Sequence, residues 1–232
     1  SDGSGATPKT SAPSMTEAME VMKPFLDEGR EIICFSISDS MSTSGNVMRL
    51  AAEELEASDK VTVINSANLS TGIGLQVIQA ALLSAEGKTR AQITAAIEEI
   101  RPRVRASFTV DTLTYLYRGG RCNAVAALAG TMLKLHPRIV VEDGAMDASK
   151  KYRGKLSSVI LSYTKDMEDD LKNAVPDRVF ITHSGCYREI VESVRSYLES
   201  LGIFNEILET RAGGVISSHC GPSTLGVLFI EK

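Results

Sequence analysis

The sequence predicts an α/β protein of two lobes, the first with a mainly parallel sheet and the second with a mixed sheet and helices. Three observations lead to this fold class. Short β-rich runs alternate with longer stretches of helical periodicity. Apolar side chains make up 43% of the residues and charged ones 23%, as in ordinary globular proteins. The length of 232 residues suits one large or two small domains, at roughly 100–200 residues each.

The predicted strands are short runs rich in β-branched and other apolar residues. They lie at Ile32–Phe35, Val61–Ile64, Ile139–Val141, Val179–Thr182 and Leu225–Ile230. Between them, apolar residues recur at intervals of three and four, which predicts helices. Three such helices cover Val47–Leu55, Leu156–Leu171 and Ile190–Leu201. Strands that alternate with helices indicate mainly parallel pairing in the first half of the chain.

One turn and one boundary complete the predicted organisation. Asp143 and Gly144 predict a hairpin turn, because this dipeptide accepts the positive φ that such turns require. A second set of strands begins near Ser107. We therefore expect an N-terminal lobe at residues 1–107 and a C-terminal lobe at residues 108–232.

Composition excludes several classes of function. The 25 basic and 29 acidic residues give a net charge of −4, so no basic surplus supports nucleic-acid binding. No apolar run approaches the ~18 residues of a membrane span, and no secretory signal is recognised, so stable membrane insertion is not expected. The four cysteines form no CxxC pair and the three histidines lie far apart. This spacing predicts no metal site and a reducing, cytoplasmic location.

The first two of four polar loops supply hydroxyls. In Pro8–Ser14, Ser14 is the expected N-cap of a helix with Glu17 completing a capping box, which leaves Thr10 and Ser11 available for a ligand. The second loop follows the first predicted strand, and its five hydroxyls exceed the need of one helix cap. They belong to Ser38, Ser40, Ser42, Thr43 and Ser44. Hydroxyls at the carboxyl end of a strand, before a helix, favour an anion site.

The other two polar loops supply an arginine and a histidine. In Arg118–Arg121 the glycine pair permits close backbone approach, and two guanidiniums can hold a carboxylate or phosphate. A glycine helix stop with solvated arginines is equally compatible with this spacing. His219 precedes Gly221-Pro222 and is expected in a tight loop, as a ligand or as a structural histidine.

Weaker motifs are discounted. Gly72 and Gly74 lack the third glycine of a dinucleotide fingerprint, and no GxSxG nucleophile turn occurs. His183-Ser184 follows a predicted strand, but a serine hydrolase there has no recognisable acid partner and no nucleophile turn.

Taken together, the four loops resemble the DegV family of bacterial fatty-acid-binding proteins. Pro8–Ser14 is similar to its P-x-T-S-Q-P-S segment, and Ser38–Ser44 to its S-S-x-L-S-G-T loop. Val110–Arg121 is similar to V-D-x-L-x-Y-L-x-x-G-G-R, the most specific match. Ser218–Val227 is similar to the closing T-H-x-G-P-G-A-L-G-V. The matches appear in order and cover nearly all of residues 7–231.

The sequence departs from the family pattern in two ways. Ala12 stands where Gln is usual, and the serine loop differs at Asp39, Thr43 and Gly45. Members of the family also begin with an extra strand and a D-S-x-x-D-L segment, which is not found before Pro8. These departures concern the register of the serine loop and one strand of the first lobe.

The resemblance implies a carrier of one long-chain fatty acid, held in a tunnel between two α/β lobes. The ligand-binding residues that it implies are Thr10, Ser11, Ser38, Ser42, His219 and Arg121. Some members are the acyl-carrying subunit of fatty acid kinase, whose separate kinase subunit phosphorylates the bound carboxylate, and the Gly-Gly-Arg arginine is implicated in that transfer. The chain is then expected to be a lipid-binding protein, with no catalytic residue or cofactor of its own and a fatty acid kinase subunit as partner.

Two rival hypotheses remain open. A hydrolase or acyltransferase would use a hydroxyl of Ser38–Ser44 as nucleophile and His219 as base. A dinucleotide-binding enzyme would need Gly72 and Gly74 to hold phosphate.

Overall fold

The computed structural model describes residues 8–121 and 135–232. These residues form two compact units, and each is described by itself. The large unit contains the described residues of 1–10, 104–142 and 146–232, and the small unit contains residues 11–103 and 143–145. The division falls at Val104, where strand β3 begins, whereas the boundary expected after Ser107 lies inside that strand.

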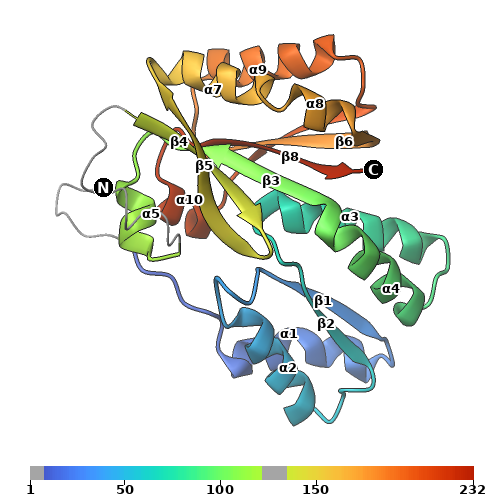
Figure 1. Ribbon diagram of the computed structural model, residues 1–232. Helices are drawn as coiled ribbons and strands as arrows, with labels where there is room; N and C mark the ends of the chain where they lie inside the picture. The colour runs from blue at the N-terminus through green and yellow to red at the C-terminus, as the bar shows by residue number, and fades with distance from the viewer. Residues whose placement is uncertain (1–7, 122–134) are drawn as a thin grey trace. The chain divides into compact units, whose positions relative to one another are not determined.

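The small unit is built on a two-stranded parallel sheet, in agreement with the predicted pairing (Figure 1). Ile32 pairs with Val61, and the register continues to Ser36 and Asn65. Its elements, in chain order, are α1 (Met15–Asp27), β1 (Ile32–Ser36), α2 (Ser44–Glu54), β2 (Val61–Asn65), α3 (Ser70–Ala85), α4 (Arg90–Ile100) and a 3₁₀ turn (Arg101–Arg103).

Helices cover both faces of this small sheet. Side chains alternate between the faces of a strand, and β1 divides accordingly. Ile32 and Cys34 pack with buried residues of α1 and α2, whereas Ile33 and Phe35 pack with buried residues of α3 and α4. Because both faces are covered, β1 is apolar at successive positions rather than at every second one.

The predicted capping box at the start of α1 is confirmed. The backbone N–H of Glu17 donates to Ser14 Oγ at 3.2 Å, and the N–H of Ser14 donates to Glu17 Oε2 at 2.7 Å. These bonds satisfy two of the N–H groups that a helix start leaves unpaired.

The large unit contains a six-stranded mixed sheet in the order β5-β4-β3-β8-β6-β7 (Figure 1). Strands β6 and β7 run parallel, and β3 with β4, β3 with β8, and β6 with β8 run antiparallel. Its elements, in chain order, are β3 (Val104–Thr109), α5 (Thr114–Gly119), β4 (Leu135–Glu142), β5 (Ala145–Arg153), α7 (Leu156–Lys165), α8 (Glu168–Lys172), β6 (Ala174–His183), α9 (Arg188–Ser200), β7 (Glu206–Arg211), α10 (Gly214–Cys220) and β8 (Leu225–Glu231).

Helices α7, α8 and α9 pack on one face of the large sheet. Tyr163 of α7 is fully buried there, and its hydroxyl donates to the carbonyl oxygen of Ser107 at 2.7 Å. The same hydroxyl accepts the backbone N–H of Val227 at 3.1 Å. One phenol therefore ties a helix to β3 and β8, the two central strands.

All five predicted strands and the predicted hairpin are present. Asp143 and Gly144 have φ values of 49° and 78°, as the turn requires. Strands β3 and β7 were not predicted as separate runs, because polar and charged residues interrupt both of them.

The single helix expected over Leu156–Leu171 is wrong, because α7 and α8 are separate helices. The break lies at Asp166 and Met167. The Asp166 carboxylate accepts hydrogen bonds from Tyr152 Oη at 2.7 Å and from Lys150 Nζ at 2.6 Å, which fixes the end of α7 against β5. Apolar residues continue their four-residue spacing through the break, so periodicity alone could not show it.

Candidate functional site

Thr10 and His219 meet in the large unit. Thr10 Oγ1 lies 2.7 Å from Nε2 of His219, so the hydroxyl and the imidazole share a hydrogen bond across 209 positions of sequence. The expectation that His219 lies in a tight loop is wrong. It occupies the last turn of the short helix α10, which ends where Gly221 adopts a φ of 79°.

The Gly-Gly-Arg segment lies against this histidine. A Cβ atom on Gly119 would be 2.2 Å from Nδ1 of His219, so only glycine allows the ring to approach this closely. Arg121 Nη1 donates to the carbonyl oxygen of Gly119 at 2.7 Å. Gly120 ends α5 in the left-handed region, with a φ of 64°. The predicted helix stop is confirmed at Gly120, and Gly119 permits the close approach of the His219 ring. Binding of an anion by the arginines stays a prediction.

Burial favours the neutral form of the His219 imidazole. Partial burial lowers the pKa of His219 below its ordinary value, and the nearby Arg121 guanidinium lowers that pKa further. A neutral ring carries one N–H. Nδ1 is buried and has no hydrogen-bond partner among the described residues, so Nε2 beside Thr10 is the nitrogen that interacts. A hydroxyl, a neutral imidazole and a nearby guanidinium together suit an anionic oxygen ligand.

The predicted serine-loop residues belong to the small unit and form hydroxyl pairs. Ser38 Oγ lies 3.1 Å from Ser40 Oγ, and Ser42 Oγ lies 2.8 Å from Ser44 Oγ. Ser38 is only 1% exposed. Thr43 is the N-cap of α2 but makes no side-chain capping bond. The hydroxyls of this loop are therefore connected mainly to one another.

The predicted ligand residues thus lie in two groups. Thr10, His219 and Arg121 are together in the large unit. Ser11 is exposed and belongs to the small unit with Ser38 and Ser42.

A third polar loop, after β2, was not predicted. Asn65 Oδ1 accepts the backbone N–H groups of Asp39 at 3.2 Å and Ala67 at 2.9 Å, which joins this loop to the serine loop. A Cβ on Gly72 would lie 2.0 Å from Asn68 Oδ1, so Gly72 is needed for packing within the small unit. The sequence could have predicted this loop, because polar residues follow the second predicted strand, whose carboxyl end lies at the same edge of a parallel sheet as that of the first.

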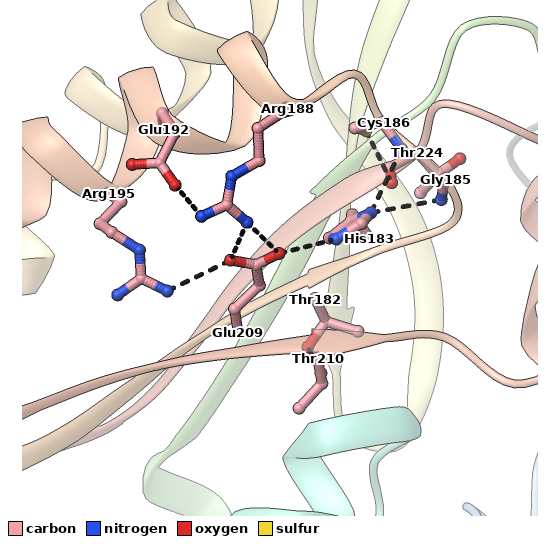
Figure 2. Close-up of polar contacts among 10 residues, drawn as sticks. All are labelled: Thr182, His183, Gly185, Cys186, Arg188, Glu192, Arg195, Glu209, Thr210 and Thr224. Carbon is pink, nitrogen blue, oxygen red and sulfur yellow. Dashed lines mark hydrogen bonds and ion pairs between the residues drawn. The ribbon is translucent and has the colours of Figure 1, made fainter.

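His183 stands in a separate cluster at the end of β6 (Figure 2). Its Nδ1 accepts the N–H groups of Gly185 and Cys186, both at 3.2 Å, and its Nε2 faces Glu209 Oε1 at 3.4 Å. The missing acid partner is therefore present, because β7 brings Glu209 alongside. Both ring nitrogens are engaged, and the hydroxyl of Ser184 donates to the carbonyl oxygen of Gly221. The ring secures a loop instead of activating a nucleophile.

The described residues contain neither a cluster of metal-ligating side chains nor a membrane-spanning helix. Over residues 8–121 and 135–232, no group of three or more His, Cys, Asp or Glu side chains is placed to hold a metal ion. None of the helices in the same ranges is long and apolar enough to cross a membrane.

Comparison of sequences identifies a family. The model of the uncharacterised DegV protein family matches residues 2–232. A DegV domain-containing protein of Deinococcus radiodurans is 31% identical over 226 residues, which cover 96% of this chain and 78% of that protein. The DegV domain-containing protein TTE1491 of Caldanaerobacter subterraneus is 29% identical over 230 residues, covering 98% and 80%.

Solved structures give the same result for the fold. A DegV family protein from Thermus thermophilus, described by its fatty acid binding, has a TM-score of 0.89 and 29% identity, covering 98% of this chain and 80% of that one. A stearic-acid-binding protein from Eubacterium ventriosum has a TM-score of 0.82 and 26% identity, covering 100% and 80%. Because the family model matches residues 2–232 of its 232 residues, this chain belongs to the DegV family.

Proposed function

We propose that this chain is a carrier of one long-chain fatty acid and that Thr10 and His219 bind its carboxylate. The observation that carries the proposal is their 2.7 Å contact, which joins two of the motif segments in a chain of the DegV family. Relatives at 26–29% identity are described as binding fatty acid or stearic acid.

The chemistry of the head-group residues supports a carboxylate ligand. A carboxylate only accepts hydrogen bonds, and when Nε2–H of His219 donates to Thr10, the hydroxyl proton of Thr10 is left to donate to the ligand. The permanent charge of Arg121 lies close enough to His219 to lower its pKa, so the same region is electropositive. Ser11, Ser38 and Ser42 are the other residues that we propose for binding the fatty acid.

One face of the large sheet carries apolar side chains, which suit contact with an acyl chain. Phe108, Phe180 and Leu228 are buried on β3, β6 and β8, and Leu228 pairs with Phe180. They alternate with residues that pack under α7 and α9, so they belong to the opposite face. About 14 methylenes of a C16 acid contribute roughly 11 kcal/mol of gross transfer free energy, at ~0.8 kcal/mol each. Costs of association reduce this value, yet low-micromolar binding remains accessible.

The finer part of the proposal is that the bound carboxylate is presented to a separate fatty acid kinase subunit. Arg121 is exposed and follows a glycine stop, and its permanent charge would stabilise negative charge that develops on a transferring phosphoryl group. The protein then supplies the substrate and one electrostatic contact, while the kinase supplies ATP and the remaining groups. The tunnel between the lobes that the family resemblance implies also stays a prediction.

Extraction of the purified protein tests the carrier function. Native mass spectrometry should show a mass increment of one fatty acid, and organic extraction followed by gas chromatography should release that acid intact. The His219→Ala variant, purified in parallel, should retain less. Protein without lipid that also fails to bind a fluorescent fatty acid would contradict the proposal. Fluorophosphonate labelling with turnover of a nitrophenyl ester would favour the hydrolase instead.

A further inference from the structure

Helices α5 and α10 of the large unit pack through two contacts between a glycine and a ring. A Cβ on Gly119 would lie 2.2 Å from Nδ1 and 3.2 Å from Cε1 of His219. A Cβ on Gly221 would lie 2.3 Å from Cδ2 of Tyr115. Each segment thus provides a glycine against which a ring of the other one rests.

The two glycines differ in their backbone conformation. Gly221 has a φ of 79°, which by itself favours glycine. Gly119 is the last residue of α5 and is outside the left-handed region. A helical position normally favours alanine over glycine. The space taken by the imidazole of His219 is therefore the reason for glycine at position 119.

The carbonyl group of Gly119 makes a second contact. It accepts the hydrogen bond from Arg121 Nη1 at 2.7 Å. One residue therefore touches the histidine through its α-carbon side and the arginine through its carbonyl oxygen.

We propose that Gly119 is a positioning residue of the head-group site: its missing side chain lets His219 reach Thr10, and its carbonyl oxygen holds Arg121. The inference rests on the proposed function for the identity of the ligand. An alanine at this position would force the ring to retreat by more than 1 Å, because its Cβ would lie 2.2 Å from Nδ1 and ordinary contact begins at 3.4 Å. That shift is enough to break a 2.7 Å hydrogen bond.

The first experiment compares Gly119→Ala with Gly214→Ala. Gly214 lies at the start of α10, has nothing within 4 Å of a built Cβ and no positive φ, so it is the matched control. Imidazole ¹⁵N NMR reports the tautomer and the pKa of His219, and titration with a fluorescent fatty acid reports affinity. In Gly119→Ala we expect the pKa of His219 to rise toward its ordinary value, since the ring becomes more hydrated, and affinity to fall at least ten-fold. Gly214→Ala should change neither.

A second variant covers the case in which Gly119→Ala unfolds. In the His219→Ala background the space beside position 119 is free, so adding Gly119→Ala should lower the urea midpoint by less than half as much as in the wild-type background. A double variant that fails to fold, while His219→Ala alone folds, would overturn the inference. Unchanged His219 resonances together with unchanged affinity in Gly119→Ala would also overturn it.

The outcomes separate this inference from the proposed function. If the wild-type protein binds no fatty acid, the carrier function is wrong. The His219 resonances of Gly119→Ala then still decide whether Gly119 positions the ring.

Discussion

At the scale of single residues, the head-group site depends on hydrogen bonds from groups that carry no charge at neutral pH. Thr10 contributes a hydroxyl, and the pKa of His219 is lowered, first by burial and then by Arg121, so the imidazole is neutral there. A hydrogen bond from a neutral donor to an ionised acceptor is stronger than one between neutral groups. The ligand is therefore expected to supply the charge of these bonds.

Thr10→Val tests the hydroxyl, because valine keeps the shape of threonine and removes the donor. We expect fatty-acid affinity to fall by about ten-fold, in line with the ~1.5–3 kcal/mol of a hydrogen bond to a charged group less some compensation by water. Displacement of a fluorescent fatty acid measures it. The control is Thr16→Val, at an exposed position of α1. Equal affinity of the two variants would remove Thr10 from the site.

Arg121→Ala tests whether the arginine serves transfer rather than retention. We expect fatty-acid retention to be nearly unchanged, because the apolar chain provides most of the affinity. With a cognate kinase and ATP, acyl-phosphate formation should fall by ~10²-fold or more, as loss of an electrostatic transition-state contact does. Arg118→Ala is the control and should lose less. Loss of retention would make Arg121 a head-group ligand, and loss of neither property would leave the segment as a helix stop.

At the scale of elements, Glu209 joins three parts of the large unit. It lies on β7 and contacts His183 of β6 together with Arg188 and Arg195 of α9 (Figure 2). Partial burial alone would raise the pKa of Glu209, but hydrogen bonds from Arg195 and His183 and the charge of Arg188 lower it below the ordinary value. The edge strand is therefore attached by charge as well as by backbone pairing.

Glu209→Gln should lower the free energy of unfolding by about 1–2 kcal/mol at neutral pH. It removes the carboxylate that faces Arg195 and one of the two carboxylates that face Arg188, which keeps its ion pair with Glu192. The folded-state pKa of Glu209 is depressed, so its contribution is fully present above the unfolded pKa of about 4.3. It is lost as pH falls through the lower folded pKa. Urea unfolding at several pH values measures the difference, which should shrink below about pH 4. The control is Glu199→Gln, at an exposed position of α9. A difference that stays constant with pH, or an effect of Glu209→Gln no larger than that of the control, would contradict this role.

The regular elements were predictable wherever a local pattern was long enough. The strands β1 and β2 and the capping box of α1 follow from apolar runs and from the spacing of Ser14 and Glu17. The position of His219 was not predictable, because α10 has only seven residues and is flanked by glycines at both ends. Fewer than two turns carry no periodic signal. The break at Asp166 was not predictable because the apolar spacing continues across it. Its partners, Lys150 and Tyr152, lie on β5 and are distant in sequence.

At the scale of the whole molecule, the site needs information that no local pattern contains. Thr10 and His219 are 209 positions apart, and residues 8–10 group with the large unit although residues 11–103 do not. The predicted single boundary near Ser107 therefore cannot describe the two units, because each unit is made of separate segments of the chain. Composition and spacing named Thr10 and His219 as separate candidates, and only the resemblance to a family placed them in one site. The pairing of Glu209 with His183 had no such guide and was missed.

Binding of the proposed ligand should stabilise the folded protein by mass action. At a free palmitate concentration of about 100 times Kd, the expected gain is about 2.7 kcal/mol. For a chain of this size that corresponds to a rise of roughly 5–10 °C in Tm. Differential scanning fluorimetry on delipidated protein measures the rise, and His219→Ala should show a smaller one at the same palmitate concentration. The same Tm with and without palmitate would argue against a specific site.

The place of β8 in the large sheet has a consequence for biosynthesis. This strand follows all the other strands in sequence, yet it lies between β3 and β6 and pairs with both. While the ribosome is still making it, β3 and β6 each present an unpaired edge, which is the kind of surface through which nascent chains associate with one another. The small unit needs almost only residues 11–103 and is free to fold first. The large sheet, in which β6 ends at His183, closes only once β8 has been synthesised, and nascent-chain chaperones are expected to act on this half of the protein.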